Sequence, residues 1–264
     1  MRFEQQGLKL AGISYDNTAI LKDFSERKHV DFPLLSDPDS KIIRAYQVLN
    51  AEATGMQRGM ARPGFFFIDP KGVIREKYFE VNYQNRFTPN NVMEKMFPEL
   101  AEGVTAKVDA PHLGLVLAQS DEIAAPGSRL SLIAEISLPS DVHVYSPGVR
   151  GYKPLELDVN PIEDIELASQ TFPQSKILFL KAINEKVPVF EGKFRVAQDV
   201  KINSSRQYSD PLPPEGKAIS ITGVLKYQAC DKTTCYLPTS VPVKWQVQVL
   251  SLDRQRVPDA IQHK

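Results

Sequence analysis

The sequence lacks the patterns that mark several common classes of protein. Lys+Arg and Asp+Glu both number 32, so neither sign is in excess to attract nucleic acid or an anionic membrane. No apolar run approaches the roughly 18 residues that a membrane helix needs. The first residues carry Arg2, Glu4 and Lys9 without a long apolar core, which does not fit a signal peptide. We therefore expect no nucleic-acid partner and no membrane span.

Motifs for cofactors and metals are also missing. There is no glycine-rich phosphate loop, no nucleotide motif and no local Ser-His-Asp signature, so we expect no cofactor. The chain has 2 cysteines, and a zinc site would need two further ligands that no nearby histidine supplies. The aspartates of "DPDS" and "DPKG" suit turns better than acid catalysis. His143 is expected to be an ordinary hydrogen-bonded polar residue.

The first hundred residues alternate strand and helix signals. Apolar runs at 8–16, 32–37 and 64–69 predict strands, and the last is followed by a turn at Gly72 and a further strand at 73–80. Apolar residues at helical spacing predict helices at 17–30, capped by Asn17 or Thr18, at 40–49, and at 88–100, capped by Thr88 with Pro89 in the first turn. This order is typical of an α/β domain.

Residues 104–252 show a different pattern from the first hundred. Alternating apolar and polar residues recur between turns rich in Pro, Gly, Ser and Asp. That pattern predicts an antiparallel β-sandwich, with Trp245 in its core. The sequence thus divides into an α/β domain at 1–103, an all-β domain at 104–252 and a polar tail at 253–264.

The segments "GLKLAGISYD", "FPLLSDPDSKIIRAYQV" and "RPGFFFIDPKGVIREKYFE" together resemble the AhpC/TSA (redoxin, peroxiredoxin-like) family of the thioredoxin fold over residues 6–100. The resemblance implies that Pro63 is the cis-proline that faces the redox centre, and X–Pro bonds do adopt cis more easily than others. Where peroxidases of the family often carry an arginine, this chain has Pro63 preceded by Arg62, which suits a thioredoxin-like redoxin better than a peroxidase.

The first half departs from that family in one decisive respect. The family's reactive cysteine lies on a strand–helix unit before "GLKLAGISYD", whereas residues 1–229 contain no cysteine and the chain starts within that helix, near residues 2–6. Without a sulfur nucleophile there, we expect no peroxidase activity from this half. The missing strand would leave unpaired edges, so we expect that Met1 is not the natural start. The alternative is a scaffold or docking role for this half.

Both cysteines lie in "YQACDKTTCY", where Cys230 and Cys235 enclose a four-residue polar loop between two strand-like stretches. A hairpin would place them opposite each other, within reach of a disulfide. Such a bridge is either redox-active or structural; as a staple it would add only about 2 kcal/mol. Lys232 would favour a thiolate and Asp231 would oppose it. Metal-bound or free thiols remain a third alternative.

The stretches "HVYSPGVRGYKPLEL", "VPVFEGKFRVAQDVKI" and "ITGVLKYQACDKTTCYLPTSVPV" resemble the N-terminal periplasmic domain of the thiol:disulfide interchange protein DsbD, over residues 105–250. The resemblance implies an immunoglobulin-like fold and a cysteine pair that passes electrons. By position, Cys235 would form the mixed disulfide and Cys230 would resolve it, although the family's pair is separated by one residue more. It also places Tyr145 near the family's shielding loop. Tyr227 and Tyr236 are candidates for a docking face.

Taken together, these features predict an incomplete redoxin domain followed by a DsbD-like sandwich that exchanges electrons through Cys230 and Cys235. The expected partners are thioredoxin-like or other thiol–disulfide proteins. The location implied by analogy is periplasmic or otherwise extracytoplasmic. Two competing functions are a peroxiredoxin whose catalytic cysteine lies upstream of Met1, and a non-catalytic interaction module with a structural disulfide.

Overall fold

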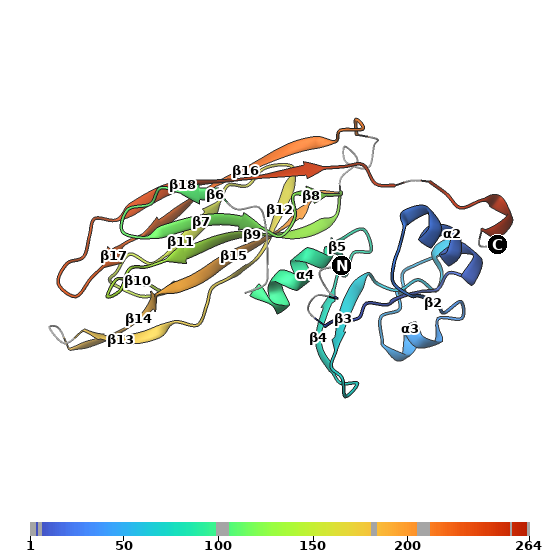
Figure 1. Ribbon diagram of the computed structural model, residues 1–264, viewed down its shortest axis with the longest axis horizontal. Helices are drawn as coiled ribbons and strands as arrows, with labels where there is room; N and C mark the ends of the chain where they lie inside the picture. The colour runs from blue at the N-terminus through green and yellow to red at the C-terminus, as the bar shows by residue number, and fades with distance from the viewer. Residues whose placement is uncertain are drawn as a thin grey trace. The chain divides into compact units, whose positions relative to one another are not determined.

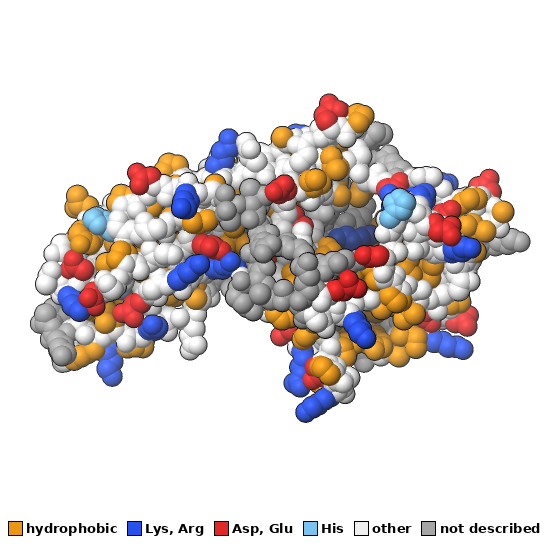
Figure 2. All heavy atoms as spheres, viewed as in Figure 1, with side chains coloured by type: hydrophobic (Ala, Val, Ile, Leu, Met, Phe, Trp, Pro, Cys, Tyr) orange, Lys and Arg blue, Asp and Glu red, His pale blue; other side chains and the backbone are white. Residues whose placement is uncertain are grey.

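The computed structural model describes residue 4 and residues 7–98, 106–180, 184–204, 212–253 and 255–262. The chain forms two compact units, of which unit 1 comprises Met1–Arg86 and Asp253–Lys264, and unit 2 comprises Phe87–Leu252 (Figure 1). On the visible face, cationic and anionic side chains are interspersed (Figure 2). None of the helices in the described ranges is long and apolar enough to cross a membrane.

Unit 1 alternates strands and helices in the predicted order. Its elements are β1 (Gly12–Ser14), α2 (Thr18–Lys28), β2 (Leu34–Ser36), α3 (Lys41–Ala45), the 3-10 turn η1 (Gly55–Gln57), β3 (Gly64–Ile68) and β4 (Ile74–Phe79); β5 (Arg86–Phe87) lies at the division between the units. The helix expected near residues 2–6 lies largely outside the described residues. A short C-terminal 3-10 turn, η3 (Asp259–Ile261), also belongs to unit 1.

Local side-chain chemistry explains where these elements begin. Asn17 caps α2, since its side-chain oxygen accepts hydrogen bonds from the N–H groups of Ala19 and Ile20. The β3–β4 hairpin turns at Gly72, whose φ of +78° lies in the left-handed region. Asp69 holds this turn by accepting from the N–H groups of Lys71 and Val73. The aspartate of "DPKG" is therefore a turn residue, as predicted.

The strands of unit 1 form two separate two-stranded sheets. β1 and β2 are parallel, and β3 and β4 are antiparallel; no pairing joins β1 to β3 in the described part of the chain. Apolar side chains on these sheets remain partly uncovered, with Ile13 43%, Leu35 52% and Ile74 45% exposed. Unpaired strand edges were expected here, and within the described ranges β1 to β4 each pair with one other strand.

The prediction of a cis bond at Pro63 is wrong in this structure. No peptide bond in the described ranges is cis, so Arg62–Pro63 is trans. Pro63 comes directly before β3, and its carbonyl accepts a hydrogen bond from the N–H of Glu80, which follows β4. This hydrogen bond extends the β3–β4 pairing by one step beyond Gly64 and Phe79.

Unit 2 is β-rich, as predicted. A six-stranded sheet contains β12 (Ile165–Thr171), β15 (Lys193–Ile202), β9 (Ser128–Ser137), β7 (Gly114–Gln119), β6 (Ala106–Val108) and β5. A four-stranded sheet contains β11 (Glu156–Val159), β16 (Lys217–Tyr227), β18 (Thr239–Val249) and β8 (Ile123–Ala124). A second four-stranded sheet contains β13 (Lys176–Leu180), β14 (Glu185–Glu191), β10 (His143–Tyr145) and β17 (Ala229–Cys230).

One hydrophobic core joins these sheets. Alternate residues of β16 and β18 are buried, among them Ile221 and Trp245, and they share a cluster with Leu130 and Leu132 of β9. The Trp245 indole N–H donates to the Ala118 carbonyl of β7 at 2.9 Å, which ties β18 to the neighbouring sheet. Period-two burial thus produces the layered β-domain that the sequence predicts. Its immunoglobulin-like topology remains a prediction.

The division between the units differs from the expected boundary at 103/104, which lies outside the described residues. Helix α4 (Pro89–Met96), capped by Thr88, groups with unit 2. Its Asn91 is fully buried and donates to Ser131 of β9, and its Lys95 lies 2.7 Å from Asp199 of β15. Because these polar contacts fix α4 to the β-domain, the structural division falls before the helix.

The C-terminal segment groups with unit 1. Asp253 contacts Arg27 at 2.9 Å and Lys28 at 2.5 Å, and both cations lie in the last turn of α2. The hydrogen bond from Lys28 contributes most to lowering the pKa of Asp253 to about 2, and the Gln255 N–H and Arg27 add to it. The polar tail expected at 253–264 is therefore attached at its start by ion pairs.

Candidate redox site around the Cys230–Cys235 disulfide

The two cysteines lie in the loop that joins the two longest strands of the β-domain. β16 and β18 pair along their full length, ending at the pair Tyr227 and Thr239. Beyond that pair, β17 leaves the hairpin and pairs with β10, so that Cys230 lies opposite His143. The loop is therefore held by two different sheets.

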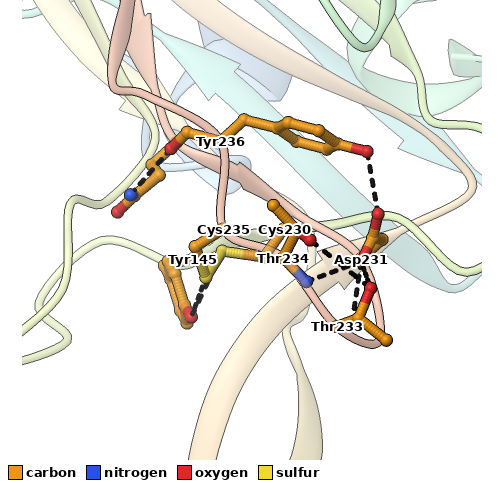
Figure 3. The surroundings of a disulfide bond; sticks show 8 residues. Tyr145, Cys230, Asp231, Thr233, Thr234, Cys235 and Tyr236 are labelled. Atoms are coloured by element: carbon orange, nitrogen blue, oxygen red, sulfur yellow. Dashed lines mark hydrogen bonds between the residues drawn. A yellow bond between two sulfur atoms is a disulfide. The ribbon is translucent and has the colours of Figure 1, made fainter.

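Cys230 and Cys235 form a disulfide bond with a Cα–Cα distance of 4.0 Å (Figure 3). The two residues also form an antiparallel bridge, which matches the opposed arrangement that the hairpin predicts. Short Cα–Cα distances are typical of antiparallel pairs that lack hydrogen bonds to each other. The geometry thus shows a bridge between neighbouring strands, and by itself it is compatible with both a structural and a redox role.

The two sulfur-bearing residues differ in their environment. Cys230 is 1% exposed and packs with Tyr145, Val187 and Val189 in a small apolar cluster. Cys235 is exposed on the loop. Leu237, two residues farther on, has 86% of its surface exposed. An incoming thiolate therefore has access to Cys235 and is kept from Cys230.

Asp231 organises the turn between the cysteines. One carboxylate oxygen accepts hydrogen bonds from the backbone N–H groups of Thr233 at 2.7 Å and Thr234 at 2.8 Å. The other accepts from the Tyr236 hydroxyl at 2.8 Å (Figure 3). The Thr233 N–H bond contributes most to lowering the pKa of Asp231 below its usual range, and the Tyr236 hydroxyl adds to it. Asp231 is thus an anchor for the turn.

Lys232, the cation expected to favour a thiolate, contacts Asp141 instead. The two charged groups are 2.8 Å apart, and the Lys232 side chain is 74% exposed. A solvated ion pair of this kind has little influence on a neighbouring buried group. In the structure, the Asp231 carboxylate therefore holds the turn, and the Lys232 ammonium group pairs with Asp141.

Tyr145 lies against the disulfide. Its side chain is 1% exposed, and its hydroxyl oxygen lies 3.5 Å from Cys230 Sγ and 3.7 Å from Cys235 Sγ (Figure 3). Disulfide sulfurs carry no proton, so the hydroxyl is the donor in these contacts. The ring of Tyr152 stacks on Tyr145 with centroids 4.3 Å apart. Tyr145, predicted near the site, is thus in contact with both of its sulfurs.

His143 belongs to the same site, which the sequence did not suggest. It is 5% exposed, and its ring meets Tyr145 edge-on with centroids 5.5 Å apart. Burial lowers its pKa, although Glu191 and Asp231 act in the opposite direction. Its Nε2 has no hydrogen-bond partner among the described residues, so the expected ordinary hydrogen-bonded role is not what the structure shows at that atom.

The other two predicted tyrosines have structural roles. Tyr227 is 2% exposed in the main core, and its hydroxyl donates to the Pro111 carbonyl at 2.7 Å, so the predicted docking role for Tyr227 is wrong. Burial raises the pKa of Tyr227 to about 12. Tyr236 is half-buried, stacks on His112 at 3.7 Å and bonds Asp231, so it stabilises the loop beside Cys235.

In comparisons with known proteins, the two halves of the chain match two different families. Residues 1–77 match the AhpC/TSA family, and residues 115–245 match the N-terminal domain of the thiol:disulfide interchange protein DsbD. Among curated proteins, the chain is 47% identical over 47 residues to Peroxiredoxin tpx1 of Schizosaccharomyces pombe and 32% identical over 88 residues to Peroxiredoxin 1 of Sulfuracidifex metallicus. These matches cover 18% and 31% of this chain, and the chain spans only 22% and 39% of the length of those two relatives.

Among solved structures, the N-terminal periplasmic domain of ScsB from Proteus mirabilis is similar with a TM-score of 0.39 and 11% identity, covering 54% of this chain and 51% of that chain. The yeast GGA1 GAE domain is similar with a TM-score of 0.29 and 16% identity, covering 54% of this chain and 98% of that chain.

The two family matches and the disulfide support a thiol–disulfide redox function in general terms. Residues 1–77 are similar to the AhpC/TSA family and residues 115–245 are similar to the DsbD N-terminal domain, and the cysteine pair lies within the second of these regions.

Proposed function

We propose that this protein is a thiol–disulfide oxidoreductase that exchanges electrons through Cys230 and Cys235. The observation that carries the proposal is the unequal exposure of the two cysteines, with Cys235 open to solvent and Cys230 1% exposed. Exchange needs one sulfur that a partner thiolate reaches and a second that departs and later returns. In this role Cys235 forms the mixed disulfide and Cys230 resolves it.

The exchange is written as two substitutions at sulfur. A partner thiolate attacks Cys235 Sγ, a new S–S bond forms, and the electron pair of the old bond leaves on Cys230 Sγ. The partner's second thiolate then attacks the partner sulfur of the mixed disulfide and releases Cys235 as a thiolate. The partner is oxidised to a disulfide, and this protein gains two electrons and takes up two protons from water. The reverse sequence passes the electrons onward.

The alternative is a structural disulfide in a non-catalytic interaction module. The Asp231 contacts argue against it, because they order the turn without help from the disulfide. The reduction potential separates the two functions. A value between about −120 and −270 mV supports exchange, and a value below about −300 mV supports a structural bridge.

The assignment of roles to the two sulfurs has its own test. In Cys230→Ser, the remaining Cys235 thiol is exposed, so we expect rapid formation of a mixed disulfide with a thioredoxin-like protein or with an aromatic disulfide reagent. In Cys235→Ser, the remaining Cys230 thiol is buried, so the same reaction is expected to be several-fold slower. Equal trapping rates in the two variants would contradict the assignment.

Both cysteines of this sequence, Cys230 and Cys235, lie in unit 2, so the thiol chemistry of this sequence lies there as well. We propose that unit 1 serves as a redoxin-type docking or scaffold segment for that chemistry, without peroxidase activity of its own. The expected partners are thioredoxin-like or other thiol–disulfide proteins, and the expected location is periplasmic or otherwise extracytoplasmic. The DsbD-type match supports the expected partners, since the described function of that family is thiol:disulfide interchange.

A further inference from the structure

The Tyr145 hydroxyl is enclosed at the disulfide and directed at its sulfurs. It lies 3.5 Å from Cys230 Sγ and 3.7 Å from Cys235 Sγ. Among the described residues, these two sulfurs are its hydrogen-bond partners. A buried hydroxyl usually satisfies itself on an oxygen or nitrogen atom, because a sulfur is a weak acceptor. A neutral disulfide is therefore a weak hydrogen-bond acceptor for this hydroxyl, whereas a thiolate at the same position would be a strong acceptor.

The position of Tyr145 is fixed from two sides. Its strand β10 pairs with both β14 and β17, so its backbone is held beside Cys230. Its ring is stacked on Tyr152 at an interplanar angle of 29°. The Tyr152 hydroxyl donates to Glu185 at 2.7 Å, so Tyr152 is committed elsewhere and leaves the Tyr145 proton to the sulfurs. Tyr152 is thus a positioning residue.

We propose that Tyr145 is a catalytic residue, whose hydroxyl donates a hydrogen bond to the Cys230 thiolate released when the disulfide opens. This inference rests on the proposed exchange through Cys230 and Cys235, and it adds the group that stabilises the departing sulfur. Tyr145 keeps its own proton throughout. The electron pair goes to Cys230 Sγ, and the protons that complete the dithiol come from water.

Burial explains why this hydrogen bond matters. Cys230 is 1% exposed among Val187, Val189 and Tyr145, so water does not solvate the thiolate that forms there. A buried charge is costly unless it is paired or hydrogen-bonded. The charged and titratable groups near the site do not supply a cation, because Lys232 pairs with Asp141 and burial lowers the pKa of His143.

Tyr145 keeps its hydroxyl proton at neutral pH, as a hydrogen-bond donor must. Burial raises its pKa, and the carboxylate of Glu185 adds to that rise. The hydroxyl therefore remains a donor at neutral pH. The other carboxylates that act on the site, Glu191 and Asp231, oppose a thiolate, which increases the need for a donor at Cys230.

The test removes the hydroxyl and keeps the ring. In Tyr145→Phe, we expect reduction of the disulfide by dithiothreitol to slow about tenfold or more, the fold-change that corresponds to losing a hydrogen bond to a charged group. In a Cys235→Ala background, we expect Tyr145→Phe to raise the pKa of the Cys230 thiol by about one unit, measured by thiolate absorbance against pH. Tyr227→Phe is the matched control, since it removes another buried hydroxyl that bonds Pro111.

The two readouts separate the failure of this inference from the failure of the proposed function. If the wild-type disulfide exchanges and Tyr145→Phe matches wild type in rate or in thiol pKa, the role of Tyr145 is overturned and the exchange function stands. If folded wild-type protein resists dithiothreitol altogether, the exchange function and the role of Tyr145 both fail. A slower rate with a raised thiol pKa, in a variant that melts near the wild-type temperature, supports the inference.

Discussion

At the scale of single residues, the site depends on which polar groups touch the sulfurs and which only hold the loop. Tyr145 contacts both sulfurs, whereas Asp231 and Tyr236 contact each other and the turn. Tyr227, which the sequence places close to Cys230, lies in the core and bonds Pro111. Residues only three positions from a cysteine can thus be structural, and a residue 85 positions away can be part of the chemistry.

Asp231 carries a prediction about pH. Its folded-state pKa is depressed, so its contribution to stability is complete above the unfolded value of about 3.9 and is lost as the pH falls toward the lower folded value. We expect Asp231→Asn to lower the melting temperature at pH 7, because the amide accepts the turn's hydrogen bonds less strongly than a carboxylate. The difference between wild type and variant should shrink progressively below about pH 4.

The control for this prediction is Asp158→Asn, which neutralises a carboxylate paired with Lys226 on the surface, with side chains 55% and 48% exposed. Exposed pairs contribute little to stability, so its melting temperature should stay close to that of wild type. A difference between Asp231→Asn and wild type that stays constant from pH 7 to pH 2, measured by thermal unfolding, would contradict the role of the Asp231 charge.

At the scale of elements, helix α4 shows how a few buried polar contacts decide which unit a segment joins. The helix signals were correct, including Thr88 as the cap, whose hydroxyl accepts from the Asn91 N–H at 3.0 Å. The face that it buries carries Asn91 and Glu94, and burial raises the pKa of Glu94. Its partners Ser131 and Asp199 belong to the β-domain.

The Lys95–Asp199 contact gives a prediction about stability. The side chain of Asp199 is 3% exposed and that of Lys95 is 20% exposed. Lys95→Met removes the cation that lies 2.7 Å from the buried Asp199 carboxylate. The cation that then faces Asp199, Arg129, is farther away, at 3.9 Å. We expect a loss of about 2–4 kcal/mol in the free energy of unfolding, measured with denaturant. Lys176→Met, which removes a lysine 70% exposed, should change it by less than about 0.5 kcal/mol.

At the scale of the whole molecule, the two units differ in how much hydrophobic core and strand pairing they contain. Unit 2 has a continuous core that includes Leu130, Ile221 and Trp245. In the described residues of unit 1, the strands form two separate two-stranded sheets, with Ile13, Leu35 and Ile74 partly exposed. Small sheets of this kind have little independent stability. We therefore expect unit 2, which carries the disulfide, to be the more stable part of the chain.

This difference predicts how fragments behave. A fragment of residues 87–252 should fold alone and keep the exchange reaction, whereas a fragment of residues 104–252, the division expected from sequence, lacks α4. Without the helix, Asp199 loses Lys95 and Ser131 loses Asn91. We expect the shorter fragment to melt at a clearly lower temperature, measured by circular dichroism. Equal melting temperatures would show that α4 contributes nothing to the β-domain.

The sequence by itself determined the features that depend on local chemistry. Hydrophobic periodicity indicated an α/β segment before a β-rich domain, capping residues located the starts of α2 and α4, and "DPKG" produced the turn at Gly72. The polar loop between two alternating stretches placed Cys230 opposite Cys235. Each of these follows from neighbours in the chain, because side-chain alternation, caps and turns are set within a few residues.

Tertiary structure alone decided what depends on burial. The resemblance placed Tyr145 near the site, but only folding brings its hydroxyl to the sulfurs and sets His143 opposite Cys230. Folding also removes Tyr227 into the core, leaves Pro63 trans and assigns α4 to the β-domain. It also makes one cysteine accessible and the other not. The physical reason is that exposure and hydrogen-bond partners are set by strands distant in sequence, such as β10 and β17, which local patterns do not pair.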